Sequence, residues 1–301
     1  MFIINHRKIF FALSGLLIGA SIVVIYVYGF HLGTDFKGGS VLEMSYSGNT
    51  RPDMNTIKGS LDKQNLGSYV LTPSGDKNYI LKTGELNPAK KSEVESVFSP
   101  TFYSQAIEVR FNSIGPTVGS QLKHKASIAI IVVIICIVLF ITFAFRKISH
   151  PVASWKYGLA TIIALAHDVI IPTGVFVLWS HFRGGEIDLL FVTALLAILG
   201  YSVHDTIVVF DRIRENLHHL EARLPSDYFE QVVGKSVSQT FGRSINTSLT
   251  IFLALITLYF IGGASTKDFA FVLLIGIIAG TYSSIFVASP LLVTLEKLQK
   301  K

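Results

Sequence analysis

The chain contains 301 residues, of which 50% are hydrophobic and only 15% are charged. Soluble globular domains carry about 25% charged residues, so this composition excludes an ordinary soluble protein. The formal net charge is +6, but the lysines and arginines are spread over short segments between apolar stretches. This distribution excludes a nucleic-acid-binding protein, which would gather its basic residues into one patch or stripe.

Six apolar segments are long enough to cross a bilayer, which takes about 20 residues in a helix. The predicted spans are residues 9–30, 126–145, 157–179, 189–210, 243–263 and 269–295. Lysine and arginine are frequent in residues 1–8, in the segments after the second and fourth spans, and in 296–301. Because cytoplasmic segments carry the excess of positive charge, both termini are predicted to be cytoplasmic.

Residues 31–125 form the long hydrophilic segment of the chain, and the charge rule places it outside the cytoplasm. Alternating β-rich stretches and helix signals, such as Asn87 followed by Pro88, predict the order βαββαβ. The strands are expected at 40–45, 68–72, 78–83 and 105–111, and the helices at 52–64 and 87–98. This order is typical of a ferredoxin-like α+β sandwich. The segment contains no residue set that resembles a catalytic site, so we expect a binding or docking domain.

Two spans contain an adjacent histidine and aspartate, His167-Asp168 in the third and His204-Asp205 in the fourth. Placing a carboxylate at the bilayer centre costs at least about 2.5–3.5 kcal/mol, so such residues usually face other helices, form pairs or serve an ion path. Two interpretations remain open: a proton-coupled step, or a static buried pair that fixes helix packing. Adjacent residues of a helix point in different directions and no third ligand is evident, so a metal site is not expected.

The cytoplasmic start of the fifth span carries a polar stripe. Asn246, Thr247 and Thr250 follow Arg243 at i+3, i+4 and i+7, a spacing that places all four side chains on one helix face. The fourth and fifth spans are antiparallel, so Arg243 can lie at the same depth as Asp205. We therefore expect an ion pair between these two residues, supported by the polar stripe.

The segment 211–242, between the fourth and fifth spans, is polar and helical in character, and Pro225 divides it. An amphipathic helix can lie in the membrane interface with its apolar stripe towards the lipid. We therefore expect the second half to lie along the inner membrane surface. Its apolar stripe consists of Phe229, Val232, Val233, Val237 and Phe241.

Small residues recur in the sixth span. Gly276 and Gly280 form a Gly-x-x-x-Gly spacing, which Ser284 and Ala288 continue. Such a spacing lets two helices approach closely. It predicts helix packing rather than a ligand site.

Four stretches of the chain form motifs. Those in the third and fifth spans are Ala166-His167-Asp168-Val169 and Arg243-Ser244-Ile245-Asn246-Thr247-Ser248-Leu249-Thr250. That after the first span is Gly33-Thr34-Asp35-Phe36-Lys37-Gly38-Gly39. That of the fourth span is Gly200-Tyr201-Ser202-Val203-His204-Asp205, continued by Asp211 and Arg212. Together they closely resemble the signatures of the SecD/SecF family of export proteins, within the resistance-nodulation-division superfamily. The short external domain resembles that of the SecF branch, although His204 stands where members often have Asn.

The resemblance implies a bacterial inner-membrane protein that pairs with SecD in a pseudo-symmetric bundle. It implies association with the SecYEG channel, in an assembly that can include SecA, YidC and YajC, and contact with exported unfolded polypeptides, protons and membrane lipid. The implied role is to assist late-stage export with the proton-motive force. By position, Asp205 and Arg243 would be the coupling pair and Asp168 a further contributor.

Two other functions remain open. One is a proton-driven efflux half-transporter of the same superfamily, and the other is a non-conducting assembly factor in which the buried charges only pack helices. An enzyme is not expected, because the sequence has no nucleotide-binding glycine loop and no Gly-x-Ser-x-Gly motif. For the same reasons no cofactor is expected.

Overall fold

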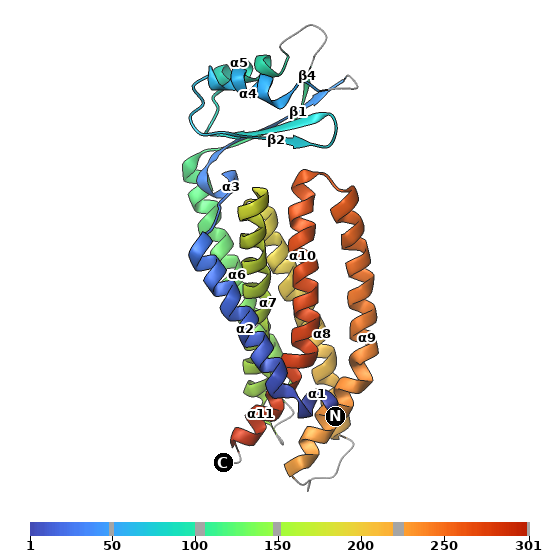
Figure 1. The fold of residues 1–301 in the computed structure, drawn as a ribbon. Helices are drawn as coiled ribbons and strands as arrows, with labels where there is room; N and C mark the ends of the chain where they lie inside the picture. The colour runs from blue at the N-terminus through green and yellow to red at the C-terminus, as the bar shows by residue number, and fades with distance from the viewer. Residues whose placement is uncertain (48–50, 100–105, 147–151, 219–225, 300–301) are drawn as a thin grey trace.

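The computed structural model describes residues 1–47, 51–99, 106–146, 152–218 and 226–299. A bundle of long helices carries a small α/β domain at one end, and the short helix α1 (Phe2–Asn5) lies near the other end (Figure 1). Within the described residues, six helices are long and apolar enough to cross a membrane. This confirms the predicted number of spans.

The helices of the bundle run beyond the predicted apolar segments, because a helix does not end at the edge of the hydrocarbon layer. The last of them, α10, continues through a π-helical turn, η1 (Ser284–Ala288), into α11 (Ser289–Gln299). The second span begins at Pro116 rather than residue 126, directly after the last strand of the domain. The long helices are α2 (Arg7–Tyr28), α6 (Pro116–Ala144), α7 (Ser154–Arg183), α8 (Leu189–His218), α9 (Ser226–Ile261) and α10 (Ala264–Ser283).

Helices α7, α8 and α10 form the buried centre of the bundle, whereas α2, α6 and α9 stand on its outside. Glycines allow the central helices to approach closely. A Cβ atom added to Gly276 would lie 2.1 Å from Cδ1 of Ile198, and one added to Gly280 would lie 3.1 Å from Cβ of Ser202. The Gly-x-x-x-Gly spacing therefore lies at the contact between α10 and α8.

Helix α9 departs from the predicted division between an amphipathic segment ending at residue 242 and a span starting at 243. It is one continuous helix from Ser226 to Ile261. Most of the apolar stripe expected on the membrane surface is buried inside the protein instead, whereas Phe241 is exposed. Phe229, Val233 and Val237 lie in a core shared with α1 and α11, which contribute Ile4 and Leu292. Pro225, expected to divide the segment, lies outside the described residues.

The domain between α2 and α6 has the predicted βαββαβ order. Its strands form one antiparallel sheet in the order β2-β3-β1-β4, which is the ferredoxin-like arrangement. Helices α4 and α5 cover the face of the sheet that points away from the bundle (Figure 1). The elements are β1 (Gly39–Tyr46), α4 (Met54–Asp62), β2 (Val70–Ser74), β3 (Asn78–Thr83), α5 (Pro88–Phe98) and β4 (Ala106–Ile114).

Gly38, just before β1, and Gly39, its first residue, make a close crossing of the backbone possible. Gly38 and Gly39 have φ of +81° and +138°, and a Cβ atom on Gly39 would lie 2.5 Å from the carbonyl oxygen of Thr83. Gly119 of α6 is equally close, since its Cβ atom would lie 2.9 Å from the amide nitrogen of Gly38. The start of β1 therefore packs directly against the start of the second span.

The domain is also tied to the loop between α7 and α8. In the short helix α3 (Thr34–Lys37), the Asp35 carboxylate accepts a hydrogen bond of 3.0 Å from the amide of Leu189, the first residue of α8. Lys82 of β3 forms an ion pair of 2.8 Å with Glu186 of the loop. The base of the domain thus contacts the helix that carries Asp205.

Candidate functional site

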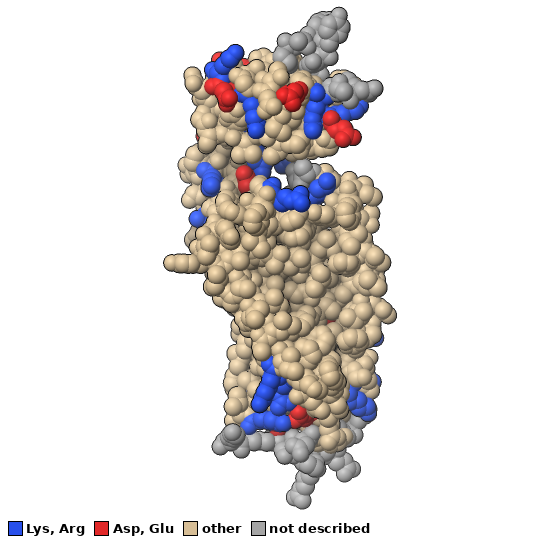
Figure 2. Space-filling model, viewed as in Figure 1, with Lys and Arg blue, Asp and Glu red and all other residues tan. Residues whose placement is uncertain are grey.

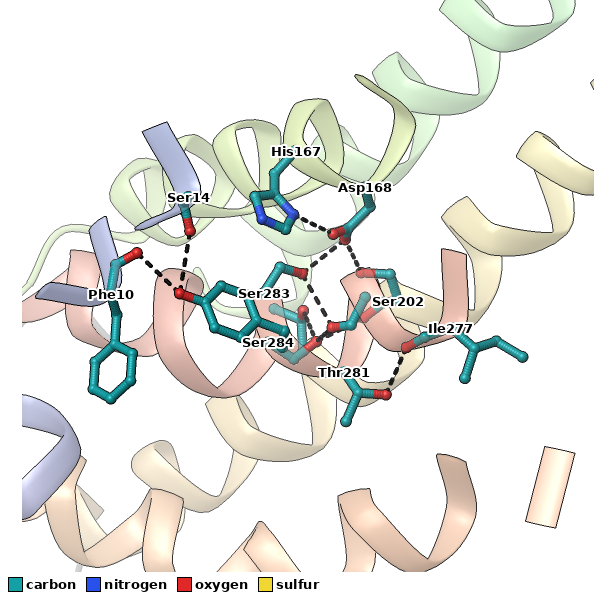
Figure 3. A network of polar contacts seen from close by, with 12 residues as sticks. Phe10, Ser14, His167, Asp168, Ser202, Ile277, Thr281, Ser283 and Ser284 are labelled. Atoms are coloured by element: carbon teal, nitrogen blue, oxygen red, sulfur yellow. Dashed lines mark hydrogen bonds and ion pairs between the residues drawn. The ribbon is translucent and has the colours of Figure 1, made fainter. Parts of the chain in front are cut away.

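Asp168 lies at the buried centre of the bundle, on α7. Its Oδ1 atom is 2.9 Å from Nδ1 of His167, and its Oδ2 atom accepts hydrogen bonds from the hydroxyls of Ser202 and Ser283, the latter at 2.8 Å. These donors come from α7, α8 and α10, and they converge on the carboxylate in Figure 3. The carboxylate therefore joins the three central helices, and both of its oxygens have hydrogen-bond partners.

His167 connects this carboxylate to the first span. Its ring is fully buried and stacks on the ring of Tyr282, with 5.7 Å between the centroids. The Tyr282 hydroxyl donates to the backbone oxygen of Phe10 in α2 at 2.9 Å. Nε2 of His167 has no hydrogen-bond partner among the described residues. The His167-Asp168 pair is thus enclosed by protein on α2, α7, α8 and α10.

Asp205 has a different environment, one helical turn further along α8 than Ser202. Its Oδ1 atom accepts a hydrogen bond of 2.5 Å from the Ser244 hydroxyl of α9. Its Oδ2 atom is buried and, within the part of the chain that the structure describes, has no hydrogen-bond partner. Burying a carboxylate oxygen without a hydrogen bond costs free energy. Among the described residues, Asp205 has fewer hydrogen-bond partners than Asp168.

The expected ion pair between Asp205 and Arg243 is not formed in the described structure. Arg243 is exposed and points to a polar pocket, whereas its neighbour Ser244 contacts Asp205. Successive residues of an α-helix point about 100° apart, so when Ser244 points at Asp205, Arg243 points away from it. His204, next to Asp205, is exposed as well.

The expected polar stripe of α9 also faces outwards. Asn246, Thr247 and Thr250 are all exposed, like Arg243. The inward face carries Ser244 and Ser248 at i, i+4 instead. Ser248 lies 2.6 Å from Thr281 of α10 and 2.6 Å from the Tyr201 hydroxyl of α8, measured between oxygen atoms.

Sequence reasoning missed these inward hydroxyl residues because serine and threonine are common in membrane helices and are not ionisable. A signal was present: hydroxyl side chains recur at helical spacing in three successive spans. Those on α8, α9, α10 and η1 that bond across helices include Ser202, Thr206, Ser244, Ser248, Thr281, Ser283 and Ser284.

A pocket of about 360 Å³ opens between α8 and α9, next to Arg243. Arg212, one of the motif residues, donates to Glu215 at 2.5 Å and to Gln239 at 2.7 Å, and so joins the two helices. The motif residue Asp211 lies 3.4 Å from Arg214. The lining residues are Val208, Asp211, Arg212, Glu215, Gln239, Thr240 and Arg243.

The remaining motif residues differ in their surroundings. Phe36 is buried beneath the domain, in the same apolar cluster as Phe176 of α7. Gly200 has open space where a Cβ atom would lie. Among the described residues, no group of three or more His, Cys, Asp or Glu side chains is arranged to hold a metal ion.

Comparison with known proteins gives two matching family models. The model described as protein export membrane protein SecD/SecF, C-terminal, matches residues 93–298, and the SecD/SecF GG motif matches residues 23–49. The second match contains the Gly38-Gly39 crossing.

Relatives and solved structures agree with these matches. The chain is 40% identical to a protein translocase subunit SecF of Thermobaculum terrenum, over 98% of this chain and 93% of the relative. It is 38% identical to one of Alicyclobacillus acidocaldarius, over 96% and 91%. The crystal structure of SecDF from Thermus thermophilus matches with a TM-score of 0.80 and 32% identity. That match covers 98% of this chain but only 38% of the longer SecDF chain.

Proposed function

Since the chain belongs to the SecD/SecF family of protein-export membrane proteins, we propose that it acts as the SecF subunit of a bacterial protein translocase, paired with SecD. Its termini would lie in the cytoplasm and its α/β domain outside. The charge distribution supports a membrane-spanning arrangement. On the face drawn in Figure 2, charged side chains gather towards the two ends, with a long, almost uncharged region between them.

The observation that carries this proposal is the exposed polar face of α9. Arg243, Asn246, Thr247 and Thr250 are exposed on a helix long and apolar enough to cross the membrane. An arginine facing lipid costs about 2.5–3.5 kcal/mol even on the most lenient scale, so this face needs a polar covering. Helices of a SecD partner would supply it, as the match to less than half of the SecDF chain supports.

The proton-coupled part of the proposal rests on Asp205. Within the described residues its Oδ2 atom has no hydrogen-bond partner and can take up a proton, and Ser244, which donates to Oδ1, sits on the same α9 helix that would face SecD. A shift of α9 would therefore change the number of donors to Asp205. In this way a proton gradient could drive helix movement, with Arg243 completing the site against a SecD carboxylate. The domain would transmit the movement to polypeptide leaving the SecYEG channel.

Inverted membrane vesicles containing this chain, SecD and SecYEG test the proposal. Completion of a stalled export intermediate is followed with and without a proton gradient, in wild type, Asp205→Asn and the control Asp76→Asn. Asp76 is an exposed carboxylate in a turn of the domain. We expect the gradient to accelerate completion in wild type and Asp76→Asn, and not in Asp205→Asn. Equal acceleration in all three, with assembly intact, would contradict the role of Asp205.

A further inference from the structure

The polar pocket between α8 and α9, of about 360 Å³, lies near the end of the bundle that is opposite to the α/β domain (Figure 1). Its lining comes from residues 208–215 of α8 and 239–243 of α9. Further along α9, towards the middle of the bundle, Leu249 and Leu253 are exposed, as expected for a surface in contact with lipid. The pocket therefore lies where the charged end of the bundle meets its apolar surface.

The lining carries charges of both signs. Two arginines, Arg212 and Arg243, are balanced by two carboxylates, Asp211 and Glu215. Arg243 is exposed and has no hydrogen bond or ion pair with another described residue. Arg212 uses Nη1 for Glu215 and Nε for Gln239, and in the described part of the chain its Nη2 atom has no partner. Guanidinium donors of both arginines thus remain available to a ligand.

Such a lining favours a ligand that also carries both charges. An anion alone would be repelled by the carboxylates, and a cation alone by the arginines. Guanidinium groups bind phosphate through paired N–H donors, and a primary ammonium offers three N–H donors to carboxylates. Pockets for small ligands have volumes of about 300–1,000 Å³, so this one suits a headgroup rather than a whole lipid. A phosphoethanolamine group combines the two charges.

The position of the pocket favours a membrane lipid as the source of this group. Both helices are long and apolar enough to cross the membrane, and in the orientation proposed above their pocket-bearing ends face the cytoplasm. A headgroup of the inner leaflet can enter from the side while its acyl chains stay against the apolar surface of the bundle. A soluble phosphate ester lacks this second, favourable contact.

From this geometry we propose that the pocket binds the headgroup of a phosphatidylethanolamine molecule of the inner leaflet. The phosphate lies against Arg243 and Arg212, and the ammonium lies against Asp211 and Glu215. The choice of leaflet rests on the orientation in the proposed function, whereas the site itself does not depend on proton coupling. A guanidinium has five N–H donors, so Arg243 can hold the phosphate and still face a carboxylate of SecD.

Lipid binding to the purified full chain, without SecD, tests the proposal. Native mass spectrometry in detergent gives a dissociation constant for the first bound lipid. Phosphatidylethanolamine, phosphatidylcholine and phosphatidylglycerol with identical acyl chains are compared. We expect phosphatidylethanolamine to bind about tenfold more tightly than the other two. The reason is that phosphatidylcholine has no N–H donors for the carboxylates, and phosphatidylglycerol has no positive charge.

Three variants assign this binding to the pocket. Arg243→Gln should weaken phosphatidylethanolamine binding about tenfold, and it should fold because Arg243 is exposed. Asp211→Asn combined with Glu215→Gln should remove the preference over phosphatidylcholine, because the ammonium loses its acceptors. Lys235→Gln is the control, since Lys235 is an exposed basic residue of α9 outside the pocket, and it should leave binding unchanged.

Crosslinking locates the lipid independently of affinity. Phosphatidylethanolamine with a photoreactive group next to the glycerol should label peptides that contain residues 208–215 or 239–243, and Arg243→Gln should reduce this labelling.

Three results would overturn the proposal. Equal affinity for the three lipids in wild type would remove the selectivity, and unchanged affinity in Arg243→Gln would place the lipid elsewhere. Glycerophosphoethanolamine that binds as tightly as the lipid would show that the site takes a soluble phosphate ester. SecD and export are absent from these assays, so a failure of the proposed function would leave the lipid site standing, and the reverse also holds.

Discussion

Asp168 and Asp205 lie in successive spans, each directly after a histidine, yet their carboxylate oxygens have different hydrogen-bond partners. The first carboxylate is held by donors from three helices and the second by one serine. Their presence inside the membrane could be predicted from sequence, because long apolar segments with a single acidic residue are easily found. Their partners could not, because hydroxyl donors come from other helices and depend on the rotation of each helix.

The direction in which Arg243 points could not be predicted from the sequence either. The depth of this residue relative to Asp205 could be estimated from the antiparallel order of the spans. The side of α9 that faces α8 could not, because both the Arg243 face and the Ser244 face carry polar residues at helical spacing. Rotating α9 by about 100° about its axis would exchange the Ser244 face for the Arg243 face.

One prediction at this scale concerns the glycine contact of α10. Gly276→Ala would push a methyl group into Ile198 and should destabilise the folded chain by about 1–3 kcal/mol, as overpacking of a core does. Gly200→Ala, in open space on α8, should be neutral or stabilising by up to about 1 kcal/mol. Thermal unfolding of the isolated chain in detergent measures both. A stable Gly276→Ala variant would show that α10 and α8 are further apart than described.

A second residue-scale prediction concerns pH. Burial raises the pKa of Asp188, at the outer end of α8, with Asp35 nearby adding to the shift, against a hydrogen bond from the amide of Phe191. Because the pKa is higher in the folded than in the unfolded chain, this group lowers stability as pH rises from below the unfolded pKa through the folded one. Asp188→Asn should therefore stabilise the chain more at pH near 7 than near 3.

Unfolding temperatures of wild type and Asp188→Asn at the two pH values give this difference. The other carboxyl groups titrate in both proteins, so their contributions to stability cancel in the difference. Asp76→Asn, in an exposed turn, is the control and should show no such pH-dependent gain. A gain for Asp188→Asn that is larger in acid would contradict the direction of the shift.

At the scale of elements, α9 shows why amphipathic patterns are ambiguous. An apolar stripe at helical spacing has the same period whether a membrane surface or a protein core covers it. Here α1 and α11 provide the cover, and both lie at the far ends of the sequence. Ion pairs connect the same segments: Glu230 of α9 pairs with Arg7 at 2.7 Å and also with Lys297 of α11. Local sequence could not reveal this three-way contact.

Cysteine accessibility tests this arrangement of α9. In a Cys136→Ala background, Val233→Cys should resist a maleimide reagent in detergent until the protein is denatured, because Val233 is fully buried. Ser238→Cys, exposed on the same helix, should react at once. Rapid labelling at both positions would restore the alternative of a helix lying on the membrane surface.

At the scale of the whole molecule, most of the architecture could be predicted. The six spans and the βαββαβ domain follow from hydropathy and from turn and cap residues such as Asn87, whose side chain accepts from the amide of Lys90 at 2.8 Å. The contacts between domain and bundle could not be predicted. They depend on Lys82 and Glu186, which are far apart in sequence and resemble any other surface charges.

The Lys82–Glu186 pair gives a prediction at this scale. It is partly exposed and so contributes little to stability, about 0–1 kcal/mol, but it restrains the domain relative to the bundle. Spin labels at Ser92→Cys and Arg183→Cys, in the Cys136→Ala background, report this distance. Lys82→Glu should broaden the distance distribution, and adding Glu186→Lys should narrow it again. A distance distribution unchanged by both substitutions would show that the other contacts, the glycine crossing and the Asp35–Leu189 hydrogen bond, are enough to fix the domain.

The pairing of β1 with β4 also has a consequence for how the protein is made. The chain enters β1 directly from α3, leaves β4 directly into α6, and pairs the two strands from Gly39 and Ile114 onwards. The domain-side ends of the first two spans are therefore joined by a sheet, and with the domain outside the cytoplasm, as proposed, this sheet would form only after residues 39–114 have crossed the membrane and folded. The two spans can thus insert before the pairing of β1 with β4 joins them. Folding of the domain becomes a checkpoint in biogenesis, and a chain that fails it would present an unjoined second span to membrane proteases.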